Sequence, residues 1–164
     1  MYLFFPDDHS HVNHYDYDSS WTGFLNTTAL SNSFICEEDI EIYDWKEQQI
    51  YLNESGNQKF IELKEKIEKQ KSTILQFVKF IVVFKKQRMY AGTFNHLMSA
   101  AAISHPVIYY DYHDYPLKKE NAKMIFTIRP IGLGGIWGSE QQNKVILNEN
   151  IRNHFLKLHK LKLG

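Results

Sequence analysis

The chain has 164 residues, of which 43% are hydrophobic and 23% are charged, and its 19 Lys and Arg balance its 19 Asp and Glu. This length is too short for a barrel enzyme of about 250 residues and suits one ordinary domain. The apolar fraction excludes disorder throughout the chain, and the zero net charge argues against a nucleic-acid binder that is basic over its whole surface.

The first part of the chain is polar and lacks regular hydrophobic periodicity. Residues 6–33 are rich in Asp, His, Asn and Ser, with aromatic residues scattered among them, so we expect an irregular N-terminal arm within residues 1–36. No export signal is recognisable, and the longest apolar run, residues 80–84, is far shorter than the roughly 20 residues of a membrane-spanning helix. We expect a cytoplasmic protein on this sequence, or a cell-envelope protein if an export signal has been removed.

The first regular elements follow this arm. Alternating isoleucines predict a strand over residues 39–45, and residues 49–52 predict a second strand after a short turn. Ser55 and Gln58 have the spacing of a capping box, which predicts a helix from Ser55 to about Lys71.

The remaining elements are predicted from apolar runs and capping residues. Residues 77–84 are almost continuously apolar and predict a central strand that is covered on both faces. Asn95 predicts the N-cap of a short helix, and Asn148 that of a terminal helix. The apolar stripe of that terminal helix consists of Ile151, Phe155 and Leu158. Further strands are expected over residues 88–93, 106–111 and 123–129. A glycine-rich loop is expected over residues 131–138.

Part of this pattern resembles a known family. Residues 50–60, the strand over 80–84 and residues 88–91 are similar to the head subdomain of the first periplasmic region of the SecD/SecDF protein-export subunits, and to small bacterial envelope proteins of unknown role. The resemblance covers about a third of the chain and implies a ferredoxin-like arrangement and a binding or scaffolding role, with no catalytic residues. We therefore expect a single α+β domain over residues 37–164, with a mostly antiparallel sheet and two or three helices on one face.

The zero net charge conceals a strong asymmetry along the chain. Residues 1–57 contain eleven acidic residues and a single basic one, whereas residues 58–164 contain eight acidic and eighteen basic residues. Two explanations fit this separation. Either the acidic part lies against the basic body of the same molecule, or an acidic, aromatic face binds a basic partner.

The densest group of potential metal ligands lies in the N-terminal arm. His9, His11, His14 and Asp16 carry imidazole and carboxylate groups that suit a divalent metal ion such as zinc, nickel or manganese. Such a local group needs a rigid scaffold to orient its ligands, so a solvated polar arm is the competing interpretation.

Three further segments have both a functional and a structural interpretation. Asp111, His113 and Asp114 could supply an acid–base pair, but we expect them to form a contact loop or to pack at a strand end. The glycine-rich loop contains Trp137, which would be a binding anchor if exposed. The basic segment over residues 152–162 could bind an anionic surface, or simply pack its apolar stripe on the sheet.

These observations predict a non-enzymatic protein-binding module, of the immunity or inhibitor type or associated with the bacterial envelope, that binds a basic protein partner and needs no cofactor. The alternative is a metal-dependent hydrolase that uses the histidine group of the arm. The residues expected to contact the partner are Asp16, Trp21, Glu37, Glu38, Asp44 and Trp137.

Overall fold

A computed structural model describes residues 1–6, 12, 17–30, 34–71, 77–96, 103–112, 124–130 and 146–164. Its strands are β1 (Tyr2–Phe4), β2 (Ile35–Cys36), β3 (Ile40–Asp44), β4 (Gln49–Leu52), β5 (Val78–Phe84), β6 (Gln87–His96), β7 (Val107–Tyr112), β8 (Met124–Arg129) and β9 (Leu161–Lys162). Its helices are α1 (Ser19–Thr27), the short 3-10 helix η1 (Glu37–Asp39), α2 (Glu54–Lys71) and α4 (Glu149–Lys157).

The nine strands form one mixed sheet that curls into a half-barrel, in the order β2-β1-β5-β6-β7-β8-β4-β3-β9. The pairs β6–β7 and β3–β9 are parallel, and the other neighbouring pairs are antiparallel. The predicted ferredoxin-like arrangement is therefore wrong. Strands β6 and β7 lie side by side in the same direction, and the short C-terminal strand joins the sheet beside β3.

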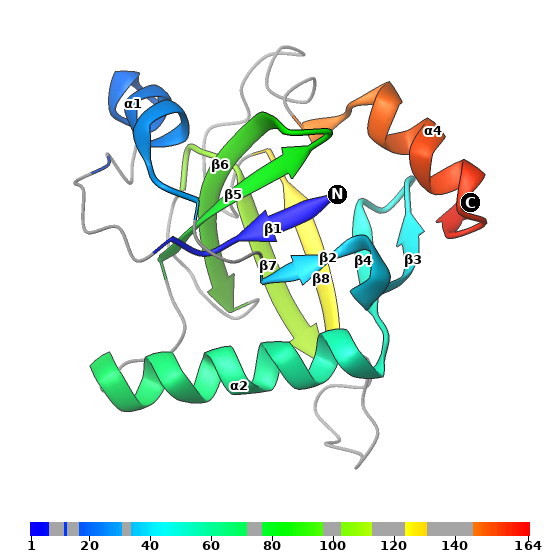
Figure 1. Ribbon diagram of the computed structural model, residues 1–164, viewed down its shortest axis with the longest axis horizontal. Helices are drawn as coiled ribbons and strands as arrows, with labels where there is room; N and C mark the ends of the chain where they lie inside the picture. Colours follow the sequence, from blue (N-terminus) through cyan, green and yellow to red (C-terminus); the bar gives the residue numbers. More distant parts are fainter. Residues whose placement is uncertain are drawn as a thin grey trace.

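The helices cover both faces of the sheet, which corrects the prediction that they share one face. Phe60 of α2 and Phe155 of α4 belong to the main core, inside the curl, and Phe60 packs against Phe126 with ring centroids 5.1 Å apart. Trp21 and Phe24 of α1 instead pack on the outer face of β5 and β6 in a second cluster. Figure 1 shows α2 along one end of the sheet, α1 outside β5 and β6, and α4 at another corner.

Strand β5 is apolar on both sides because both of its faces are covered, as its sequence predicts. Phe80, Val82 and Phe84 point into the main core, whereas Ile81 and Val83 belong to the cluster under α1. This arrangement fits the alternation of side chains along a strand. The strand order also places β5 in the interior of the sheet, between β1 and β6.

The described parts of the N-terminal segment include regular elements where an irregular arm was expected. β1 lies within the sheet, between β2 and β5, and α1 is a regular helix whose N-cap, Asp18, accepts a hydrogen bond from the backbone N–H of Ser20. Burial of Trp21 and Phe24 explains why this helix forms despite a weak hydrophobic period. The sheet and α1 therefore both include residues from the segment predicted as an extension.

Two predicted helix caps differ from the structure, and one is confirmed. Asn53, not Ser55, caps α2, because its side-chain oxygen accepts a hydrogen bond of 3.0 Å from the backbone N–H of Gly56. Asn95 lies within β6, and its side chain accepts a hydrogen bond from the backbone N–H of Phe77 instead of capping a helix; the helix expected after it falls on residues 97–102, outside the described part of the chain. Asn148 caps α4 as predicted, accepting from two backbone N–H groups of the first turn.

Candidate functional site

Glu37 and Asp39, two of the three acidic residues of η1, are bound to cationic groups of the same molecule. The Glu37 carboxylate lies 2.5 Å from the amino group of Met1 and 2.7 Å from Nε2 of His154 on α4. Partial burial favours the neutral acid, but the hydrogen bonds from these two groups outweigh it and hold the pKa of Glu37 below its ordinary value. Lys160 adds a bond of 2.7 Å to the backbone oxygen of Glu37. Glu37 therefore ties together β1, α4 and the segment before β9.

Asp39 is the centre of a second group at the start of α2. Its carboxylate accepts hydrogen bonds from Ser55 Oγ at 3.0 Å and Lys59 Nζ at 2.7 Å, and it lies 3.1 Å from Cys36 Sγ. Burial opposes ionisation, but the bond from Lys59 leads the contacts that lower the pKa of Asp39. Burial, together with hydrogen bonds to Glu38 and Asp39, raises the pKa of Cys36 to about 11. The thiol stays protonated near neutral pH and is a poor nucleophile.

Asp44 forms the third of these contacts, at the other edge of the sheet. Its carboxylate lies 2.7 Å from Lys162 Nζ, and Asp44 is only 2% exposed whereas Lys162 is 58% exposed. A further bond comes from the backbone N–H of Glu47. Burial again opposes ionisation of Asp44, and the bond from Lys162 leads the contacts that lower its pKa. This ion pair joins β3 to β9.

These contacts bear directly on the acidic surface predicted from the sequence. Asp39 and Asp44 are paired with Lys59 and Lys162 of the basic part of the chain, as the first explanation of the charge asymmetry predicts, and Glu37 is paired with the amino group of Met1. Trp21 is fully buried against Phe24 and the ring of His105. Of the expected contact residues that the structure describes, only Glu38 is exposed. Asp16 and Trp137 lie outside the described residues.

The candidate metal ligands also lie outside the described part of the chain. This applies to His9, His11, His14 and Asp16, and likewise to His113 and Asp114 of the second polar segment. Within the described ranges, no group of three His, Cys, Asp or Glu residues is arranged to hold a metal ion.

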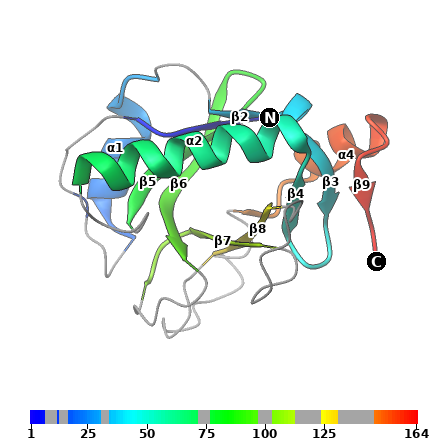
Figure 2. The ribbon, with the colours of Figure 1, turned by 90° about the horizontal axis from the view of Figure 1, so that it is seen from below.

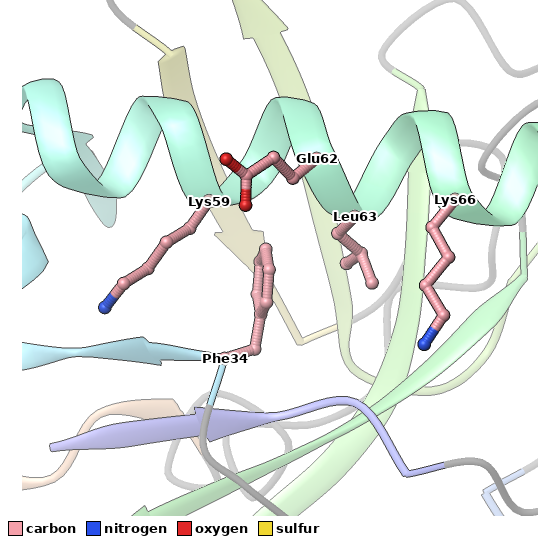
Figure 3. Close-up of a pocket in the computed structure, with 5 residues that line it drawn as sticks. All are labelled: Phe34, Lys59, Glu62, Leu63 and Lys66. Atoms are coloured by element: carbon pink, nitrogen blue, oxygen red, sulfur yellow. The ribbon is translucent and has the colours of Figure 1, made fainter.

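A shallow groove runs beside the middle of α2. It has a volume of about 360 Å³ and is lined by Phe34, Lys59, Glu62, Leu63 and Lys66 (Figure 3). The ammonium group of Lys59 is bound to Asp39, and Glu62 accepts a bond of 2.9 Å from Gln58. The groove therefore combines a small apolar floor with opposite charges that largely cancel.

Exposed leucines and lysines follow one another along the chain from the last turn of α4 to the residue after β9. Leu156, Leu158 and Leu163 are 46%, 38% and 50% exposed and form a large share of the exposed aliphatic side chains in the described residues. Lysines alternate with them along the chain. We call this the leucine–lysine surface, and it consists of Leu156, Lys157, Leu158, Lys160, Lys162 and Leu163.

The local structure explains why these leucines face solvent. Ile151 and Phe155 form the buried side of α4, as predicted, but the helix ends at Lys157 and the chain turns at His159, which has a φ of 56°. Leu158, expected to continue the buried stripe, therefore lies beyond the helix and is exposed. A sequence period alone could not locate this helix end.

Additional positive charge lies near the same end of the molecule. Phe84 packs against the ring of His154 with centroids 5.2 Å apart, which brings the turn between β5 and β6 close to α4. That turn carries two exposed lysines, Lys85 and Lys86. The C-terminal end of the chain lies at one extreme of the molecule (Figures 1 and 2).

The described helices do not include one that is both long and apolar enough to cross a membrane. Comparison with known proteins adds no further assignment. No protein-family model, no curated protein sequence and no solved structure matches this chain.

Proposed function

We propose that this protein is a non-enzymatic protein-binding module and that it docks an acidic partner protein on the leucine–lysine surface. The observation that carries the proposal is the run of three exposed leucines and three lysines from the last turn of α4 to the residue after β9. Exposed apolar side chains grouped within a polar rim are typical of protein contact sites. An immunity or inhibitor role is one form that such binding would take.

The two kinds of side chain contribute in different ways. Covering the exposed parts of Leu156, Leu158 and Leu163 would stabilise a complex by about 1 kcal/mol for each side chain, on the scale of about 25 cal/mol per Å² of apolar surface. The lysines would accelerate encounter with an acidic surface and select against basic ones. Lys85 and Lys86 extend this positive field at the same end of the molecule.

The expected charge of the partner follows from which charged side chains already form ion pairs within this molecule. A basic partner, expected from the acidic first third of the chain, would have to compete with His154 for Glu37 and with Lys162 for Asp44. An acidic partner needs no such exchange at Lys157, which is exposed at the end of α4, whereas Lys160 and Lys162 already bond to Glu37 and Asp44 and would share their ammonium groups with it. A second copy of this chain would bring its own lysines against these and be repelled.

Site-specific photo-crosslinking in the source cell tests this proposal. A photoreactive residue replaces Leu156 in one version and Ile61, which is similarly exposed on α2, in the matched control. We expect one reproducible adduct from position 156 with a protein whose surface is acidic, and none of that adduct from position 61. The proposal is wrong if position 156 gives no adduct, or if the adduct forms equally at both positions.

A further inference from the structure

The two edges of the sheet differ in their capacity to bind another strand. At the β2 edge, the chain turns directly into η1, and the backbone N–H of Cys36 donates to the Asp39 carboxylate at 3.0 Å. The N–H of Cys36 is therefore already bonded to a side chain of the same segment. At the opposite edge, β9 pairs with β3 alone among the described residues.

The register of β9 shows which of its backbone groups face outward. Tyr43 and Trp45 of β3 donate their N–H groups to the carbonyl oxygens of Lys160 and Lys162, at 2.7 and 2.9 Å. Successive residues of a strand direct their backbone groups to opposite sides. The N–H and C=O groups of Leu161, and the N–H of Leu163, therefore face away from β3.

We propose that an extended, acidic segment of the partner adds to the sheet along this outer edge of β9. The inference rests on the proposed function and specifies its partner chemistry, because strand addition uses main-chain hydrogen bonds for affinity and alternate side chains for selectivity. The segment would be an acidic and apolar stretch of a protein, bound in extended conformation.

The side chains of β9 define the pattern that this segment must have. Leu161 packs against the main core, and Leu163 follows on the same face, whereas Lys162 lies on the opposite face beside Asp44. Apolar side chains of an added strand would contact the two leucines, and its alternate carboxylates would lie near Lys162. The ammonium group of Lys162 has three donors, so it can bind a second carboxylate while it keeps Asp44.

The same lysines limit unwanted pairing at this edge. An unpaired strand edge is a general site of self-association, and lysines placed along it repel another copy of the same edge. At β9 this repulsion comes from Lys160 and Lys162, which flank Leu161. An acidic segment turns the same charges into attraction, so the edge selects for it over a second copy.

The affinities of two synthetic peptides test this inference. One labelled, end-capped peptide of eight residues alternates Val and Asp, and the control has the same composition in two blocks. We expect fluorescence anisotropy to show at least tenfold tighter binding of the alternating peptide at low salt. We also expect amide exchange to slow at Leu161 and Leu163 when that peptide is bound.

Two substitutions at one position separate the backbone from the side chain. Leu163→Pro removes the outward N–H, whereas Leu163→Ala keeps it and shortens the side chain. We expect at least a tenfold loss of binding for the proline variant and a loss of a fewfold for the alanine variant, with both chains still folded by circular dichroism.

The outcomes distinguish this inference from the proposed function. If both peptides bind equally, Leu163→Pro has no effect and Lys157→Glu abolishes binding, then acidic docking stands and strand addition is wrong. If neither peptide binds, strand addition is also wrong, and the crosslinking result from position 156 alone then decides the proposed function.

Discussion

Lys162 of β9 and Asp44 of β3 form an ion pair of 2.7 Å, in which the carboxylate is buried and the ammonium group faces solvent. The pair fastens the last strand to the edge of the sheet, next to the parallel backbone bonds between the two strands. It also leaves the lysine accessible on the outside. The same side chain therefore serves the fold and is available to the proposed partner.

Removal of this ion pair is expected to loosen β9 without unfolding the sheet. Asp44→Asn keeps the size of the side chain but loses the charge that holds Lys162, so exchange of the β9 amides should accelerate at neutral pH. The matched variant Lys162→Met should have a similar local effect. Hydrogen exchange followed by mass spectrometry measures this, and unchanged protection of residues 160–163 in both variants would contradict the role of the pair.

Acidification should destabilise the protein through the carboxylates around η1 and β3. The pKa values of Glu37, Asp39 and Asp44 are below their ordinary values of 4.5, 3.8 and 3.8. An acid whose pKa is lower in the folded state contributes stability above its unfolded pKa and loses it as the pH falls through the folded pKa. The contribution of these three carboxylates to the free energy of unfolding should therefore be constant from about pH 6 to 5. It should decrease below about pH 4.5.

Glu37→Gln is the variant that tests this dependence. Glutamine cannot form an ion pair with Met1 or His154, so the variant should be less stable than the wild type at pH 6. The difference between the two should narrow as the pH falls towards 3. Urea denaturation at several pH values measures it, and parallel curves for the two proteins would show that Glu37 has no part in the acid response.

Cys36 should react slowly with alkylating reagents. Burial is the largest cause that raises its pKa to about 11, and the carboxylates of Glu38 and Asp39 add to it. The rate with iodoacetamide should therefore keep rising through pH 9, and Asp39→Asn should lower the thiol pKa and increase the rate at pH 8. Alkylation followed by mass spectrometry gives the rates, and full reactivity of the folded wild type at pH 7 would contradict this environment.

Gly56 should be intolerant of any side chain. A Cβ at this position would lie 2.6 Å from the backbone oxygen of Asp39, at the point where α2 passes η1. Gly56→Ala should therefore destabilise the protein by roughly 1–3 kcal/mol through steric strain. Gly23→Ala in α1 is the control, since its Cβ has no neighbour within 4 Å, and it should stabilise by about 0.5–1 kcal/mol. Urea denaturation measures the stability of both variants. Equal changes in the two would contradict the close approach of residue 56 to the backbone oxygen of Asp39.

The longer elements could be predicted from the sequence because they have enough residues to show a hydrophobic pattern. The continuous apolar run of β5, the strands β3 and β4, and α4 with its cap at Asn148 all agree with their predicted positions. Strands β1, β2 and β9 have only two or three residues each, too few for any period to appear. Their place in the sheet depends on partners far along the chain.

The candidate site could be predicted only in part, because its contacts also join residues that are far apart in the sequence. The charge asymmetry correctly indicated two regions that could attract each other, but no local pattern pairs Glu37 with His154, which lies 117 residues later. Trp21 was predicted to be a contact residue because aromatic residues are frequent at interfaces, and it is instead buried in the cluster under α1. The exposure of Leu158 follows from the helix end, where the backbone turns at His159 with a φ of 56°.

The most direct test of the central claim is the yield of the crosslinked adduct from position 156, compared between the wild type and Lys157→Glu at increasing salt. If the leucine–lysine surface docks an acidic partner, the yield should fall at least fivefold in Lys157→Glu at low salt. It should also decline for the wild type as salt screens the exposed charges. An adduct whose yield is unchanged by both the substitution and the salt would contradict the claim.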